Sequence, residues 1–283
     1  MQIIRTVKEI QSVCKWFRCE GKAIGFVPTM GALHEGHLSL VRRSIEENDR
    51  TIVSIFVNPA QFGPDEDFQH YPRDLEGDME KLSALPVDVV FMPDRGEMYP
   101  EGFSVSIDIG NVGEILCGIA RPGHFSGVAT IVAKFFNSVM PRRAYFGQKD
   151  YQQTVVIKKL VKELNFDIDS IVCPTVREPD GLAMSSRNAY LNEEERRASL
   201  VLYRALQSGE ELIQSGSMDD VLMVKKEVEA VMKSEPLAKI DYVDIVDPHN
   251  LAPIQKIIFA AIICVAARIG TTRLIDNIIV EKN

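Results

Sequence analysis

The chain has 283 residues, a length that favours roughly two domains. Hydrophobic residues make up 46% and charged residues 25%, which excludes a disordered chain, a collagen-like repeat and a disulfide-rich miniprotein. The 32 basic and 40 acidic residues give a net charge of −8, whereas proteins that bind duplex nucleic acid usually carry a basic surface. We therefore expect a globular protein with no nucleic-acid partner.

The cysteines and the apolar segments indicate the cell compartment. The five cysteines form neither a CxxC pair nor a closely spaced framework, a pattern typical of a reducing environment. Residues 1–11 lack the apolar segment of a signal peptide, and the longest apolar run, 257–267, is far shorter than the about 20 residues that span a membrane. The sequence therefore predicts a cytoplasmic protein with no membrane partner, in which this run forms a buried strand.

The first part of the chain alternates strand and helix patterns. β-Branched runs predict strands, and apolar residues at helical spacing, such as Leu38, Val41 and Ile45, predict helices. Strands are expected at 23–27, 51–57, 87–91, 144–146 and 168–172, and helices at 36–47, 74–85, 127–139 and 150–164. This alternation predicts an α/β fold, a Rossmann-like doubly wound parallel sheet that binds ligands at the carboxyl ends of its strands.

The pattern changes after Cys173 and Pro174. Loop-like residues are followed by two amphipathic helices, expected at 192–214 and 218–234. Three strands are then expected at 240–246, 257–267 and 273–280. A helical pair with a small sheet predicts a second, smaller α+β domain. We place the boundary near Thr175, which gives domains of residues 1–175 and 176–283.

The stretch PTMGALHEGHL at 28–38 carries two histidines where a strand passes into a helix. A helix N-terminus offers free N–H groups and a partial positive charge, both suited to phosphate, and Gly36 allows a ligand close to the backbone. His34 and His37, three residues apart, can both donate hydrogen bonds to one ligand. The stretch is neither a P-loop, because His37 stands where that motif has lysine, nor an HExxH zinc motif.

This stretch resembles the HIGH signature of the nucleotidyltransferase superfamily, and GLAMSSRN at 181–188 stands where those enzymes carry their KMSKS signature. Six motifs in chain order resemble the pantothenate synthetase (pantoate–β-alanine ligase) family. They are PTMGALHEGH at 28–37, VNPAQFG at 57–63, YPR at 71–73, RPGHF at 121–125, YFGQKD at 145–150, and RLIDN at 273–277 preceded by Arg268. The resemblance covers essentially the whole chain.

The resemblance implies a two-step ligase that uses ATP, pantoate and β-alanine. Pantoate carboxylate attacks the α-phosphorus of ATP, releasing pyrophosphate and leaving pantoyl adenylate. The amine of β-alanine then attacks this mixed anhydride and gives pantothenate and AMP. The resemblance also implies Mg²⁺, a homodimer built by the N-terminal domains, and a smaller C-terminal domain that acts as a lid.

The same resemblance implies which residues bind ATP. His34, His37 and Lys149 take the catalytic roles, with His37 as proton donor. The full set of expected ATP-binding residues is Met30, Gly31, Ala32, Leu33, His34, Glu35, Gly36, His37, Gly147, Gln148, Lys149, Asp150, Val176, Met184, Ser185, Ser186 and Arg187. Because Ala183 stands where the KMSKS pattern has its first lysine, Lys149 and Arg187 must supply the cationic groups.

Pantoate has two hydroxyls, a carboxylate and two methyl groups. Amide side chains, which both donate and accept, suit its hydroxyls, and apolar side chains suit its methyls. The expected pantoate-binding residues are Gln61, Gln153, Asn58, Pro28, Met30, Phe62 and Arg121, with His124 beside the last. Asp78 is the expected protein ligand of Mg²⁺.

Other interpretations of these residues and of the chain remain open. Without the family motifs, Lys149 is a solvated surface lysine, Ser185 and Ser186 form a turn or helix cap, and Asn58 is a turn residue before Pro59. A cytidylyl- or adenylyltransferase would keep the fold but need a cationic site for an acceptor phosphate. A nucleotide-binding regulator would lack the reaction altogether. Length and acidic charge disfavour a class I aminoacyl-tRNA synthetase.

Overall fold

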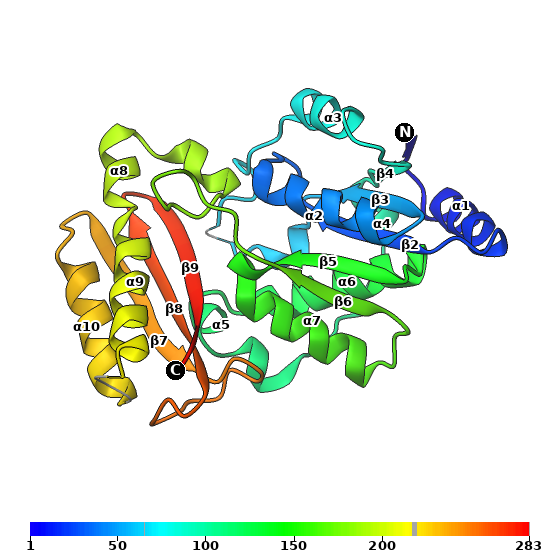
Figure 1. The fold of residues 1–283 in the computed structure, drawn as a ribbon. Helices are drawn as coiled ribbons and strands as arrows, with labels where there is room; N and C mark the ends of the chain where they lie inside the picture. Colours follow the sequence, from blue (N-terminus) through cyan, green and yellow to red (C-terminus); the bar gives the residue numbers. More distant parts are fainter. Residues whose placement is uncertain (65, 217–219, 283) are drawn as a thin grey trace. The chain divides into compact units, whose positions relative to one another are not determined.

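The computed structural model describes residues 1–64, 66–216 and 220–282, and the chain forms two compact units (Figure 1). The first unit comprises residues 1–148 and 156–174, and the second comprises residues 149–155 and 175–283. The short segment 149–155 thus groups with the C-terminal part, although the expected boundary near Thr175 assigned it to the first domain. Two hydrogen bonds within the second unit explain this: Tyr151 Oη donates to the Pro248 carbonyl at 2.7 Å, and Asn277 Nδ2 donates to the Lys149 carbonyl at 2.9 Å.

The first unit is built on a six-stranded parallel sheet in the order β1-β4-β3-β2-β5-β6. The strands are β1 (Gln2–Ile4), β2 (Ile24–Thr29), β3 (Arg50–Ile55), β4 (Val89–Phe91), β5 (Arg143–Gly147) and β6 (Asp169–Cys173). The predicted doubly wound parallel sheet is confirmed. The sequence pattern missed β1, because only one of its three residues, Ile4, is buried.

Helices cover both faces of this sheet, as the alternation of side chains along β2 shows. Phe26 contacts Phe135 of α6 (His124–Val139), with ring centroids 5.7 Å apart. The next residue, Val27, packs instead in a cluster with Leu40 and Val41 of α2 (Glu35–Glu47). Successive strand residues face opposite sides of a sheet, so each face has its own core.

The remaining helices of the chain's first part are α1 (Val7–Cys19), α3 (Leu75–Ser83), α4 (Arg95–Met98), α5 (Cys117–Ala120) and α7 (Tyr151–Glu163), the last of which continues from the second unit into the first. Helix α1 was not predicted from the sequence. Its signals are Thr6, whose hydroxyl caps the helix by accepting from Glu9 N, and the buried Ile10, Cys14 and Phe17 at helical spacing.

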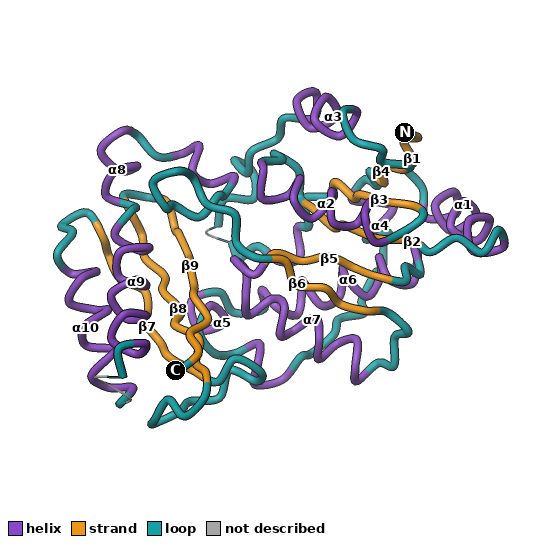
Figure 2. The backbone as a smooth tube through the Cα atoms, viewed as in Figure 1, coloured by secondary structure: helices purple, strands orange, loops and turns teal. Residues whose placement is uncertain are grey.

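The second unit holds a three-stranded antiparallel sheet of β7 (Ala238–Val246), β8 (Ala260–Ile269) and β9 (Thr272–Glu281). Helices α9 (Val201–Gln214) and α10 (Val221–Lys233) pack against each other and against this sheet (Figure 2). Their buried residues, among them Leu206, Val228 and Ile263, form one core. The predicted α+β character of this part is confirmed.

Two predicted helices of the second unit differ in the structure, and the buried strand expected at 257–267 begins only at Ala260, with Ile258 and Phe259 exposed. The helix expected at 192–214 is divided at Ser199 and Leu200 into α8 (Glu193–Ala198) and α9. The hydroxyl of Ser199 donates to the Arg196 carbonyl at 2.7 Å and so competes with helical bonding. The helix expected from Met218 begins at Val221, and Met218 lies outside the described residues. Within the described ranges, no helix has the length and apolar character needed to cross a membrane.

Candidate active site

The two histidines of the 28–38 stretch cap helix α2 reciprocally. His34 is the N-cap, and its Nδ1 accepts a hydrogen bond from Gly36 N at 3.2 Å. His37 lies in the first turn, and its Nδ1 accepts from His34 N at 3.3 Å. The two rings lie 4.1 Å apart between centroids. The helix start, whose first N–H groups lack partners within the helix itself, therefore orders both imidazoles.

These two bonds also define the chemistry of the rings. A main-chain N–H can only donate, so both Nδ1 atoms act as acceptors. In a neutral imidazole the other nitrogen then carries the proton, which makes Nε2 of each ring a donor. Two donors at the positive end of a helix are suited to phosphate oxygens.

The loop before these histidines is held by a buried carboxylate. Asp78 of α3 is 1% exposed, and its two oxygens accept from Ala32 N at 2.8 Å and Leu33 N at 2.6 Å. Lys81 Nζ donates to the Leu33 carbonyl at 2.8 Å. Gly31, with φ of +86°, supplies the left-handed backbone that the turn requires. Met30 is half-buried, and Glu35 is exposed and pairs with Arg42.

Asp78 was expected to bind Mg²⁺, but its hydrogen bonds show that it holds the loop before the histidines. Burial raises the pKa of this carboxyl, and the two amide hydrogen bonds oppose the rise. Both oxygens are already engaged in holding the loop. Among the residues that the structure describes, no group of three or more His, Cys, Asp or Glu side chains could hold a metal ion. The magnesium role of Asp78 thus remains a prediction.

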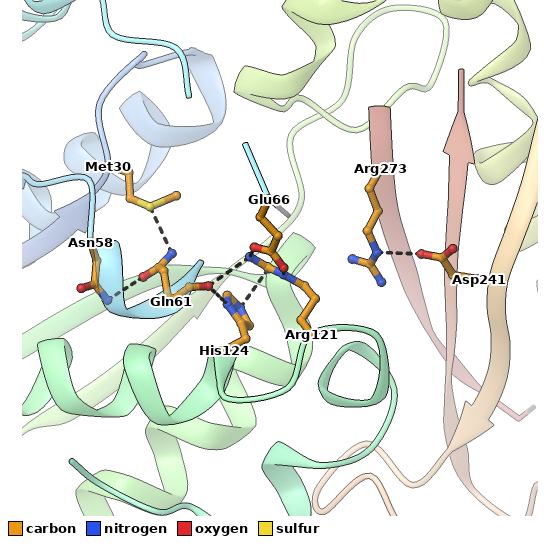
Figure 3. Close-up of polar contacts among 8 residues, drawn as sticks. All are labelled: Met30, Asn58, Gln61, Glu66, Arg121, His124, Asp241 and Arg273. Carbon is orange, nitrogen blue, oxygen red and sulfur yellow. Dashed lines mark hydrogen bonds and ion pairs between the residues drawn. The ribbon is translucent and has the colours of Figure 1, made fainter. Parts of the chain in front are cut away.

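A chain of amides connects the end of β3 with the 28–38 stretch (Figure 3). Asn58 Nδ2 donates to Gln61 Oε1 at 3.0 Å and to the Gly127 carbonyl at 3.1 Å. Gln61 Nε2 in turn lies 3.1 Å from Met30 Sδ. Because Asn58 occupies the oxygen of the Gln61 amide, the NH₂ group of Gln61 is turned toward Met30 and is the end suited to an acceptor on a substrate.

Asn58 itself has its hydrogen-bonding groups occupied by protein partners. Its Oδ1 accepts from Tyr99 Oη at 2.7 Å and from Ala60 N at 3.3 Å, and the residue is 2% exposed. Burial raises the pKa of Tyr99 to about 12, so this phenol stays a donor at neutral pH. Asn58 therefore orients Gln61, and its expected contact with pantoate remains a prediction. Sequence reasoning missed Tyr99, which lies 41 positions away.

Arg121, expected near pantoate, forms an ion pair with Glu66 (Figure 3). Its Nη2 and Nε lie 2.5 and 2.7 Å from the two Glu66 oxygens. Burial of Glu66 favours a higher pKa, but the Arg121 contacts outweigh it and lower the pKa of this carboxyl. His124 Nδ1 donates to the Gln61 carbonyl at 2.8 Å, and Arg121 Nη2 lies 3.3 Å from the same oxygen. This cluster thus fixes the backbone of Gln61.

The residues expected to form an apolar wall have different surroundings in the structure. Phe62 packs its ring against Phe68 and Tyr71, with centroids 5.3 and 5.9 Å apart, and Pro28 is half-buried in β2. Met30 contacts Gln61, as described above. Gln153, half-buried in α7, belongs to the second unit.

The YFGQKD motif places Gly147 at the end of β5 and Gln148–Asp150 in a 3₁₀ turn. A Cβ on Gly147 would meet no atom within 4 Å, so the backbone is open on that side. The side chains of Gln148 and Lys149 are half-buried, and that of Asp150 is exposed. Lys149 is therefore partly covered rather than a fully solvated lysine.

The 176–187 segment folds as a hairpin-like loop followed by a turn. Met184 N donates to the Val176 carbonyl at 3.0 Å, and Arg177 and Ala183 form a β-bridge. Ser185 Oγ accepts from Arg187 N at 3.3 Å and caps the 3₁₀ turn Ser186–Tyr190. Ser185 thus caps this turn. The ATP contacts expected of the segment remain predictions.

The RLIDN motif of β9 supplies two ion pairs in the second unit. Arg273 Nε donates to Asp241 Oδ2 of β7 at 2.7 Å (Figure 3), where the pairing of β7 with β8 shifts register. Asp276 accepts two hydrogen bonds from Arg177. Burial raises the pKa of the Asp276 carboxyl, and the contact with Arg177 opposes that rise.

The six-stranded parallel sheet with helices on both faces defines a Rossmann-like α/β protein, and its β2–α2 turn presents two histidine donors. Comparison with known proteins identifies the family. The chain belongs to the pantoate-beta-alanine ligase family, whose model matches residues 2–279.

Relatives and solved structures agree with this assignment. The pantothenate synthetase of Thermodesulfovibrio yellowstonii is 55% identical over 282 residues, which is 99% of this chain and 100% of the relative. A crystal structure of pantothenate synthetase from Thermus thermophilus has a TM-score of 0.92 and 44% identity, covering 98% of this chain and 99% of that one. The Francisella tularensis pantoate-beta-alanine ligase, complexed with beta-gamma ATP and beta-alanine, has a TM-score of 0.80 and 38% identity, covering 98% and 97%. The family resemblance of the sequence motifs is confirmed.

Proposed function

We propose that the protein condenses pantoate with β-alanine to give pantothenate, at the expense of ATP. Pantoate carboxylate attacks the α-phosphorus, pyrophosphate leaves, and the amine of β-alanine displaces AMP from pantoyl adenylate. A carboxylate does not react with amines at neutral pH, so activation is chemically necessary. The observation that carries the proposal is the ordered pair of Nε2 donors, His34 and His37, at the N-terminus of α2 in a member of this family.

The residues divide the work of the first step by their chemical type. His34 and His37 donate to phosphate oxygens, and His37 stabilises the charge that grows on the α-phosphate. Lys149 and Arg187 balance the triphosphate charge. Asp150 accepts from ribose hydroxyls, and Val176 offers its backbone to adenine. The other proposed ATP contacts are Met30, Gly31, Ala32, Leu33, Glu35, Gly36, Gly147, Gln148, Met184, Ser185 and Ser186.

Pantoate is proposed to bind through neutral amides. The NH₂ group of Gln61, oriented by Asn58, donates to a pantoate oxygen, and Gln153 serves the second hydroxyl. Pro28, Met30 and Phe62 face the methyl groups. Arg121 acts through the backbone of Gln61.

The metal ion, the oligomeric state, the cellular location and the domain roles are also part of the proposal. Mg²⁺ accompanies ATP and is held mainly by phosphate oxygens and water, because both oxygens of Asp78 already accept main-chain hydrogen bonds. When bound, it neutralises phosphate charge. The protein acts as a homodimer in the cytoplasm. The N-terminal domain, residues 1–175, carries most of the ATP and pantoate contacts, and residues 176–283 carry the remainder.

Product analysis tests this function. The protein is incubated with ATP, pantoate and β-alanine, pantothenate is quantified by mass spectrometry, and the nucleotide products are quantified by phosphorus NMR. The proposal predicts pantothenate, AMP and pyrophosphate in equal amounts, with none formed when pantoate is omitted. ADP and inorganic phosphate as products would contradict an adenylate intermediate.

A further inference from the structure

Two adjacent residues of β9 contact segments to which ATP-binding residues have been assigned. Asp276 and Asn277 are both buried, each 4% exposed. Neither has a role in the chemistry described above. Consecutive residues of a strand face opposite sides of the sheet, so two adjacent residues can contact two different segments of the chain.

Asp276 holds the base of the 176–187 loop. Its oxygens lie 2.6 and 3.0 Å from the two terminal nitrogens of Arg177, a bidentate contact. Arg177 also donates to the Gly181 carbonyl at 3.0 Å, and its guanidinium lies 4.1 Å from the centre of the Tyr203 ring. Gly181 has φ of +98°, and a Cβ there would come within 2.2 Å of Tyr203. The loop that ends in Ser185, Ser186 and Arg187 is therefore fixed at its start.

Asn277 holds the turn that carries Lys149. Its Nδ2 donates to the Lys149 carbonyl at 2.9 Å, across 128 positions of sequence. Its main-chain N donates to Asp276 Oδ1 at 2.8 Å, so the carboxylate that binds Arg177 is also tied to Asn277. One dipeptide thus fixes the backbone at two proposed phosphate-binding segments.

We infer that Asp276 and Asn277 are positioning residues for ATP, the first through Arg177 and the 176–187 loop, the second through the main chain of Lys149. The inference rests on the proposed function only in that Lys149 and the 185–187 turn bind the phosphates of ATP. Neither residue touches the reacting atoms. Their loss weakens ATP binding selectively, because the bonds they make end on the ATP-binding segments.

Calorimetric titration with ATP, in the absence of pantoate, tests the inference. Asn277→Ala is expected to raise the Kd for ATP about five- to tenfold, the worth of one buried hydrogen bond. Asn277→Asp raises it further, because a carboxylate oxygen would face the Lys149 carbonyl. Asp276→Asn also weakens ATP binding. The matched control is Asp244→Asn, which breaks the 2.6 Å ion pair with Lys225 elsewhere in the second unit and leaves ATP affinity unchanged.

The KM for pantoate, measured with the same variants, separates positioning from general support of the fold. The inference predicts that it stays within about twofold of wild type. Wild-type ATP affinity in folded Asn277→Ala and Asn277→Ser variants would overturn the inference, as would an equal loss of ATP and pantoate affinity. Were the wild type to bind ATP without forming pantothenate, the proposed function would fail, and the calorimetric comparison would still decide the role of Asn277.

Discussion

His34 and His37 cap the same helix reciprocally, and their ring centroids lie 4.1 Å apart. Each imidazole uses Nδ1 as an acceptor for a main-chain N–H of the turn, which leaves the Nε2 proton as its donor. Local capping thus prepares the donors before any ligand binds. Preorganised donors stabilise developing charge without reorganisation at the moment of reaction.

His37→Ala is expected to lower turnover by about 10² or more, because the proposed donor to the α-phosphate is lost. ATP binding weakens far less, since His34 and the helix N-terminus remain. Steady-state kinetics with each substrate varied in turn measures both effects. A thermal melt verifies that the variant is folded, and wild-type turnover in that folded variant would remove His37 from the mechanism.

Gln61→Glu is expected to raise the KM for pantoate steeply while ATP binding barely changes. The substitution keeps the size of the side chain, replaces its NH₂ donor with an acceptor, and adds a charge that repels the pantoate carboxylate. The same substitution at the exposed Gln214 of α9 serves as the control. An equal loss of ATP and pantoate binding would show that the pantoate site has been wrongly assigned.

Tyr99→Phe removes the hydroxyl that donates to Asn58 Oδ1 at 2.7 Å. The freed Asn58 amide orients Gln61 less well, so the KM for pantoate should rise about three- to tenfold, the worth of one hydrogen bond. Tyr145→Phe is a matched control, because it also removes a buried phenol that bonds Glu47 and Asn48. Both variants lose stability, but only Tyr99→Phe is expected to change the KM for pantoate. An unchanged KM in Tyr99→Phe would show that Tyr99 does not orient Gln61 through Asn58.

Glu66 should contribute to stability only above acidic pH. Its pKa is lowered by Arg121 below the ordinary 4.5, so the folded state favours the charged carboxylate. This contribution is complete above about pH 4.5 and is lost as pH falls through the lower folded-state pKa. Urea unfolding of wild type and Glu66→Gln across that range should show the variant less stable by about 1–2 kcal/mol at neutral pH. The difference should narrow in acid, and a constant difference would contradict the ion-pair account.

The fold was largely predictable, because the β-branched strands and helical apolar spacing are local signals. The division at Ser199 and Leu200 was not, since the apolar period continues across it. The histidine pair was found because its strand, glycines and helix are adjacent in sequence. The contacts that order the site were not found: Asp78 reaches Leu33 across 45 positions. Such side-chain contacts depend on tertiary packing, which no local pattern encodes.

Exchange of labelled pyrophosphate into ATP tests the central claim most directly, because adenylation must precede amide formation. With pantoate alone, the wild type should exchange label without β-alanine, and added β-alanine should release AMP in proportion to pantothenate. Lys149→Ala should suppress the exchange but spare most of the second step from preformed pantoyl adenylate, where no triphosphate is present. Exchange that strictly requires β-alanine would contradict a separate adenylation step.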